Sequence, residues 1–182
     1  DVERDFIPVS LAAMIPQIVV AHPSVPASNV QELVALLKAN PGKFNYASVG
    51  SGSPHHLFME ALKAELGLSI QHVPYKGTQA AIPDLLTGGV QMMFADATVA
   101  VPNIQAGKVT PLGTSSAKPT TLVPGVPPIA ATVKGFDWEA WQGIVAPAAT
   151  PPAIVAKLAA ELQRIQSTPE FREQLRKFGM ES

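Results

Sequence analysis

The sequence contains no cysteine, few charged residues and no long hydrophobic run. Without cysteine, disulfide bonds and thiolate chemistry are excluded, while the redox compartment stays undetermined. No apolar stretch approaches the roughly 20 residues that cross a bilayer as a helix, and no signal-peptide pattern is visible at the N-terminus. The first residue is Asp1 rather than methionine, so we expect a processed, recombinant or truncated chain.

The charges that are present nearly cancel. Thirteen basic and 14 acidic residues give a formal charge of −1 without long runs of either sign. A nucleic-acid partner is therefore not expected, and a small anion would need a local site. A chain of 182 residues that is 47% hydrophobic is long and apolar enough to fold as one large or two small domains.

Short apolar runs alternate with segments of helical spacing along the chain. The predicted strands are 6–13, 17–21, 44–48, 69–74, 90–95, 108–115 and 138–147. The predicted helices are 29–40, 55–66, 79–86 and 98–106, with two more beginning near Thr150 and Thr168. Ser28 is expected to cap the first of them, and Pro111 favours an edge position for its strand. This alternation predicts a parallel α/β sheet with helices on both faces and ligand sites at the carboxyl ends of the strands.

The most informative stretch is a loop of small residues between a predicted strand and a predicted helix. It contains Ser48, Gly50, Ser51, Gly52 and Ser53. Small residues let a ligand approach the backbone, and the first turn of a helix offers unpaired N–H groups and a positive dipole end. The pattern favours an anion. The alternative is a plain connector with a serine cap, and the loop lacks the signatures of nucleotide-binding loops.

Two further loops should reach the same edge of the sheet. One contains Lys76, Gly77 and Thr78, and the other contains Asp96. Lys76 is the one cation within a candidate loop, although most lysines in such positions are simply solvated. Three such loops at one edge favour a binding site more than any one of them alone.

The sequence offers no convincing catalytic or metal-binding set. His55 and His56 are adjacent, so on a helix they point about 100° apart and cannot share a zinc ion. His55 could contact a ligand or lie at the surface. Serines occur near histidines, but no Gly-x-Ser-x-Gly elbow is present, and Asp84 is expected to be solvated rather than paired with Asp96. No metal or cofactor is predicted.

Several collinear motifs resemble the solute-binding receptors of tripartite tricarboxylate transporters, the Bug family. The matching runs are FIPVSL at 6–11, NYASVGSGS at 45–53 with HL at 56–57, HVPYKG at 72–77, DLL at 84–86, GVQMMF at 89–94, IQAGK at 104–108, TSSAK at 114–118 and GIVAPA at 143–148. These runs are collinear and are distributed over essentially the whole chain.

The resemblance implies a periplasmic, type II binding-protein fold of two α/β lobes that forms a three-layer sandwich and closes on a ligand. The implied ligand is a small carboxylate, such as a dicarboxylate, a tricarboxylate, an amino acid or an aromatic acid, and the implied partner is a membrane permease. It also implies that the ligand meets the loop 48–53, with Ser48, Ser51 and Ser53 as donors. Further implied contacts lie near Lys76 to Thr78 and near the end of the strand 90–94. No reaction is implied.

The chain departs from the family pattern in ways that shape our expectations. Family members usually begin about a hundred residues earlier and have a further C-terminal helix. We therefore expect residues 17–135 to form the complete second lobe and residues 1–16 and 136–182 to be remnants of the first. Apolar surface should then be uncovered, which predicts self-association or a retained partner segment. Many relatives have aspartate directly after the phenylalanine, so Asp96 need not inherit its role. An enzyme using a Ser/His pair and a regulatory ligand-binding domain stay as alternatives.

Overall fold

The computed structural model describes residues 1–182, and the chain divides into two compact units. Unit 1 comprises residues 1–15 and 140–182, and unit 2 comprises residues 16–139. The boundaries lie at 15/16 and 139/140, whereas the sequence predicted 16/17 and 135/136. The larger difference arises because residues 136–139 still pack on unit 2. Phe136 stacks on Phe94, and the ring of Trp138 lies 5.9 Å from that of Phe58. The assignment of the units to receptor lobes stays a prediction.

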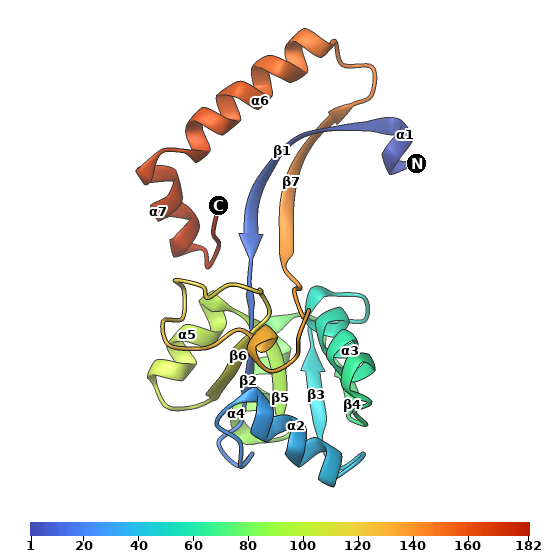
Figure 1. Ribbon diagram of the computed structural model, residues 1–182, viewed down its shortest axis with the longest axis vertical. Coiled ribbons are helices and arrows are strands. Elements are labelled where there is room, and N and C mark those ends of the chain that lie inside the picture. Colours follow the sequence, from blue (N-terminus) through green and yellow to red (C-terminus); the bar gives the residue numbers. More distant parts are fainter. The chain divides into compact units, whose positions relative to one another are not determined.

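Unit 2 is built on a five-stranded sheet (Figure 1). Its strands are β2 (Gln17–Ala21), β3 (Asn45–Ser48), β4 (Gln71–Pro74), β5 (Met92–Asp96) and β6 (Thr110–Thr114), in the order β4-β3-β5-β2-β6. Strands β3, β4 and β5 are parallel, whereas β2 is antiparallel to both β5 and β6. The prediction of an all-parallel sheet was therefore wrong for β2, because its direction depends on long-range pairing. The edge position predicted for β6 is confirmed.

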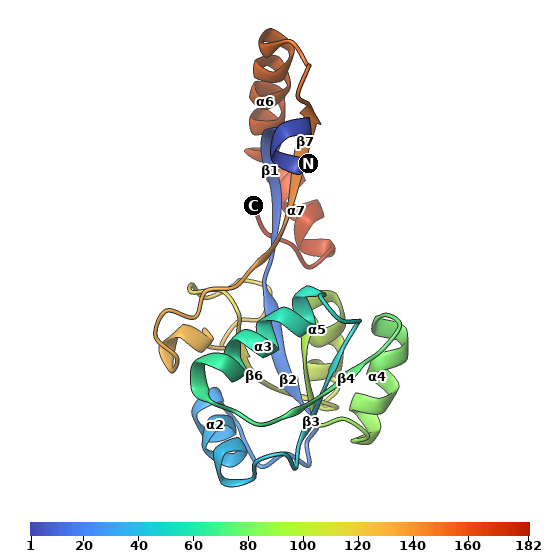
Figure 2. The same ribbon diagram turned by 90° about the vertical axis from the view of Figure 1, so that its right-hand side faces the viewer.

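Four α-helices pack around this sheet (Figure 2). They are α2 (Val30–Ala39), α3 (Pro54–Leu66), α4 (Thr78–Thr87) and α5 (Ala97–Gln105), and a 3₁₀ turn follows at Ile129–Ala131. Asn29, rather than the expected Ser28, caps α2 by accepting a hydrogen bond from the N–H of Glu32, since Ser28 itself binds the Glu32 carboxylate. Gly67 ends α3 with φ of 63°, a left-handed conformation that favours glycine.

Alternate residues of the central strands point to opposite faces, and each face buries two helices. On one face, Ile18 and Met93 pack with residues of α4 and α5, including Leu85 and Ala100. On the other face, Phe94 meets Phe58 of α3 edge to face, with ring centroids 5.9 Å apart. Gly113 lies close to α2 on that face, where a Cβ atom would stand 2.7 Å from Val30 Cγ2. Helices therefore cover both faces of the sheet, as predicted.

Unit 1 consists of a two-stranded antiparallel ribbon with three helices. Its elements are α1 (Val2–Asp5), β1 (Phe6–Ile15), β7 (Ala140–Pro147), α6 (Pro152–Gln166) and α7 (Pro169–Lys177). β1 pairs with β7, with irregularities between Pro8 and Ser10 and between Leu11 and Ala13. Pro151 occupies the cap position of α6 that the sequence suggested for Thr150.

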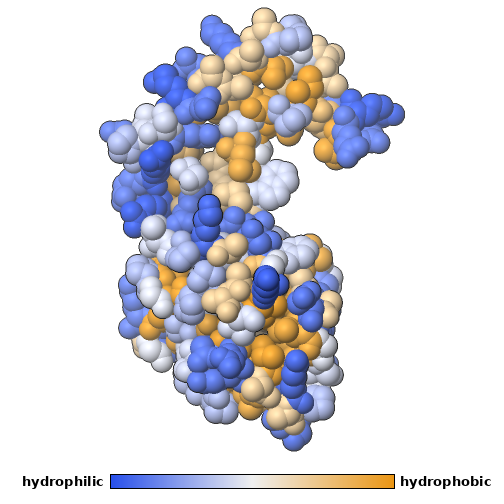
Figure 3. Space-filling model, viewed as in Figure 1, coloured by the Kyte–Doolittle hydropathy of each residue, from blue (hydrophilic) through white to orange (hydrophobic).

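Unit 1 leaves much apolar surface uncovered. Figure 3 shows apolar side chains over α6, and no residue of α6 is buried. The exposed large apolar residues of unit 1 are Val2, Phe6, Leu11, Trp141, Ile144, Val145, Ile154, Leu158, Ile165 and Phe178. The uncovered apolar surface matches the expectation, and self-association stays a prediction.

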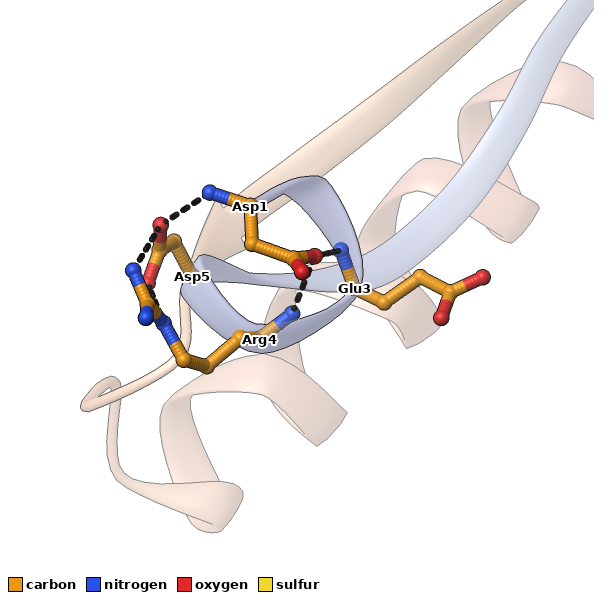
Figure 4. A network of polar contacts seen from close by, with 4 residues as sticks. All are labelled: Asp1, Glu3, Arg4 and Asp5. Carbon is orange, nitrogen blue, oxygen red and sulfur yellow. Dashed lines mark hydrogen bonds and ion pairs between the residues drawn. The ribbon is translucent and has the colours of Figure 1, made fainter.

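A polar network surrounds the short helix α1 (Figure 4). The carboxylate of Asp1 accepts hydrogen bonds from the N–H groups of Glu3 and Arg4, and the Arg4 guanidinium donates to the carboxylate of Asp5. The Arg4 guanidinium holds the pKa of Asp5 below its usual value. Because all these groups are exposed, the network contributes little to stability.

Across the structure, no helix has the length and apolar character needed to cross a membrane.

Candidate ligand-binding site

Three strand-to-helix connections meet at one edge of the unit 2 sheet. β3 leads into α3, β4 into α4, and β5 into α5. Because these strands are parallel neighbours, their carboxyl ends and the N-termini of the following helices lie at the same edge. All the sequence-predicted site residues belong to these connections.

The loop between β3 and α3 is held by the hydroxyl groups of its first and last serines. Ser48 is fully buried, and its Oγ accepts a hydrogen bond from the N–H of Gly50 and lies 2.6 Å from His72 Nε2. Ser53 caps α3 and donates to the carbonyl of Gly50 at 2.7 Å. Gly50 and Gly52 have positive φ values of 134° and 81°, which a glycine adopts without strain. These two hydroxyls therefore shape the loop.

Ser51 is the member of the loop that is left free. Its side chain is exposed, and no hydrogen bond of the protein uses its hydroxyl or its N–H. The N–H of His55, in the first turn of α3, is also without a protein acceptor. Free N–H groups at the positive end of a 13-residue helix form a suitable environment for a carboxylate. Of the three serines proposed as donors, Ser51 is the one whose hydroxyl is available.

Two stacked histidines, His56 and His72, contact the 48–53 loop. His56 Nδ1 accepts a hydrogen bond from the N–H of Gly52 at 3.1 Å, and its ring stacks on that of His72 with centroids 4.2 Å apart. His72 also stacks on Tyr46, whose hydroxyl donates to Glu60. His72 lies outside the predicted site loops, and the parallel register of β3 and β4 places it beside Tyr46. These contacts of His72 follow from the pairing of β3 with β4, which the sequence alone does not reveal.

The half-buried position of His72 makes a pH dependence testable. Burial, together with the nearby His56, lowers the pKa of His72, so the folded protein binds fewer protons than the unfolded chain below about pH 6.5. Stability should therefore fall as the pH decreases from about 7 to about 5. In His72→Gln, urea unfolding followed by circular dichroism should show a smaller fall over this range. An unchanged slope in the variant would contradict the role assigned to His72.

The second polar group of the site is formed by residues from three elements. Asp96 ends β5 and lies opposite Gln17 of β2, whose Nε2 donates to Asp96 Oδ1. His55 Nε2 lies 3.7 Å from Asp96 Oδ2, within ion-pair range but beyond a hydrogen bond. The imidazole of His55 holds the pKa of Asp96 below its usual value, although burial opposes this, so Asp96 is ionised at neutral pH. Sequence reasoning had singled out His55 and Asp96 but missed Gln17, which only the cross-strand pairing reveals.

The remaining candidates show fewer contacts. Lys76 is exposed, and Gly77 precedes Thr78 at the start of α4 with φ of 97° and without a side-chain cap. Asp84 accepts a hydrogen bond from the hydroxyl of Tyr75 at 2.6 Å and forms no pair with Asp96. No group of three histidine or acidic residues is placed to hold a metal ion.

One Ser/His pair exists, but its surroundings do not suit nucleophilic catalysis. Ser48 Oγ and His72 Nε2 are 2.6 Å apart, which is the distance that an activated nucleophile would need. Ser48 is nevertheless fully buried, and no carboxylate is hydrogen-bonded to the other nitrogen of His72. A substrate cannot reach this hydroxyl, so the pair is a structural contact.

Comparison with known proteins identifies the family of the chain. Residues 1–182 match the family described as "Tripartite tricarboxylate transporter family receptor". A protein of Pseudomonas sp. strain P51, described as "UPF0065 protein in tcbD-tcbE intergenic region", is 39% identical over 99% of this chain and 54% of its own length. The chain thus spans about half the length of the curated relatives it matches.

Solved structures of related proteins share the fold of this chain. The R. palustris protein Rpa4515, solved with adipate, has a TM-score of 0.85 and 30% identity, and the match covers 100% of this chain and 61% of that one. The periplasmic binding protein BugD has a TM-score of 0.78 and 33% identity, with 97% and 59% of the two chains covered. The fold, the collinear sequence and the family match lead to one conclusion: this chain belongs to the receptor family of the tripartite tricarboxylate transporters.

Proposed function

We propose that the protein is a periplasmic receptor that captures a small carboxylate and delivers it to the membrane permease of a tripartite tricarboxylate transporter. The observation that supports this most directly is that hydrogen-bond donors of the 48–53 loop and of the first turn of α3 are unpaired. The N–H groups of Ser51 and His55 have no protein partner, and they lie at the positive end of α3. A carboxylate can accept hydrogen bonds from both groups and from the Ser51 hydroxyl.

The relatives support the same chemistry. A related protein was solved with adipate, a dicarboxylate, and another is described as a periplasmic binding protein. The alternative of a Ser/His enzyme finds no support, since the family is one of receptors and Ser48 is inaccessible. The ligand identity, the permease and the periplasmic location of this chain are parts of the proposal.

Calorimetry against a panel of carboxylic acids tests the proposal. We expect saturable binding of one or more mono-, di- or tricarboxylates, amino acids or aromatic acids, because the site provides donors and a helix dipole. Nuclear magnetic resonance of the bound acid after prolonged incubation should show it unchanged, since a receptor does not convert its ligand. Binding of cations without binding of any acid would contradict the proposal, and so would conversion of the acid.

A further inference from the structure

The cluster around Asp96 suggests which carboxylates the site prefers. We propose that the ligand carries a positively charged nitrogen in addition to its carboxylate, and that Asp96 selects it. The ligand class is thus an amino acid rather than a plain mono- or dicarboxylic acid. This inference rests on the proposed function, because it concerns the second end of the same ligand.

Asp96 has one oxygen available to a ligand. Its Oδ1 accepts the amide of Gln17, whereas Oδ2 takes no hydrogen bond and lies 3.7 Å from His55 Nε2. About a third of the side chain, 34%, is exposed. The carboxylate is therefore held in place on one side and accessible on the other.

His55 supplies the second observation. The residue is only 6% exposed, and neither of its ring nitrogens has a hydrogen-bond partner. Buried polar side chains almost always have partners, so an unpartnered imidazole beside a carboxylate indicates a group that is missing from the protein itself. Gln17 also has a buried carbonyl oxygen without a partner, which adds another acceptor to the cluster.

The charges around Asp96 favour a cation. No lysine or arginine lies within ion-pair distance of its carboxylate, and His55 is the one basic residue there. An ionised carboxylate that is largely removed from water attracts a positive charge and repels a second carboxylate. A ligand ammonium group at Oδ2 would satisfy the free acceptor and compensate the charge.

His55 also links the two ends of the site. Its main-chain N–H belongs to the first turn of α3, where the carboxylate is proposed to bind, and its side chain faces Asp96. A single small molecule can therefore meet an anion-binding turn and a carboxylate within the reach of one residue. A ligand that carries a carboxylate and an ammonium group on neighbouring atoms would match this arrangement, with the carboxylate at the first turn of α3 and the ammonium group at Asp96.

Matched sets of ligands with the same carbon skeleton test the inference on the unmodified protein. Succinate, malate and aspartate differ only in a hydrogen, hydroxyl or ammonium group, and glutarate, 2-hydroxyglutarate and glutamate form a second set. Propionate, lactate and alanine form a third set with a single carboxylate. Calorimetry should show the ammonium member binding at least about 10-fold more tightly than the others in at least one set, as expected for a hydrogen bond between charged groups.

The variant Asp96→Asn removes the charge and keeps the shape. The preference for the ammonium member should fall by about 10- to 100-fold. Asp84→Asn is the matched control, because Asp84 is a carboxylate of the same unit that binds the Tyr75 hydroxyl instead, and it should leave the preference unchanged. Circular dichroism verifies that both variants are folded.

Three outcomes would overturn the inference. The wild-type protein could bind the unsubstituted acids or the hydroxy acids as tightly as the amino acids, or a folded Asp96→Asn variant could retain the full preference. In either case carboxylate binding itself, and with it the proposed function, would stand. If no acid of any set bound, the proposed function would fail as well.

Discussion

Replacing Phe94 by alanine is expected to lower the free energy of unfolding by about 3–5 kcal/mol, the usual cost of removing a buried phenylalanine ring. Phe94 is fully buried in β5 near the middle of the unit 2 sheet. Its ring lies edge to face with Phe58 and parallel to Phe136, at centroid distances of 5.9 and 6.5 Å. The variant would leave a cavity between β5, α3 and the segment that follows the 3₁₀ turn. Urea unfolding followed by circular dichroism measures the effect.

A control within the same unit separates this cavity from a general loss of apolar surface. Leu57 lies on α3 and is 48% exposed. Leu57→Ala should change the free energy of unfolding by less than about 1 kcal/mol, since exposed positions contribute little and alanine suits a helix. A loss below about 1 kcal/mol for Phe94→Ala would contradict the packing described for this face of the sheet.

Placing a negative charge at Ser51 is expected to weaken carboxylate binding by about 5- to 700-fold. In Ser51→Asp the new carboxylate would lie beside the free N–H groups proposed to hold the ligand carboxylate. Two like charges about 4 Å apart repel by about 1 kcal/mol in water and about 4 kcal/mol near a protein surface, and about 1.4 kcal/mol corresponds to tenfold in affinity. Calorimetry with the tightest-binding acid of the panel measures the loss.

Ser51→Asn is the matched control, because asparagine has the shape of aspartate without its charge. It should weaken binding by less than about 5-fold, since the main-chain donors stay in place. The repulsion in Ser51→Asp should also decrease at high salt if the site is solvent-accessible. Equal losses for the two variants, or none for Ser51→Asp, would mean that the carboxylate does not bind at this loop.

The candidate site shows where prediction from sequence succeeded. The run of small residues from Ser48 to Ser53 predicted a strand-to-helix loop, and the structure has β3, the loop and α3 in that order. These features are local, because glycine content, a serine cap and a proline in the first helical turn act within a few residues. That the loop, α4 and Asp96 share one edge also followed from the alternation of strands and helices.

The roles of the three serines could not be read from the chain. All three looked like equal donors, yet Ser48 is engaged with His72 and Ser53 caps α3, so Ser51 alone is free. His72 is 24 residues from Ser48, and no local pattern indicates their contact. The same reason explains why Gln17, 79 residues from Asp96, was missed.

By itself the sequence determined the strands, the six longer helices, the small-residue loops and the family, because each depends on local spacing or on collinear motifs, whereas the short helix α1 and the 3₁₀ turn were not predicted. Only the tertiary structure decided the direction of β2, the boundary after residue 139 and the partners of the buried polar groups. Strand direction and polar contacts depend on pairing between distant segments, which a linear pattern does not contain. For that reason the chain indicated an anion-binding loop, whereas the free oxygen of Asp96 and the unpartnered His55 became visible only in the folded protein.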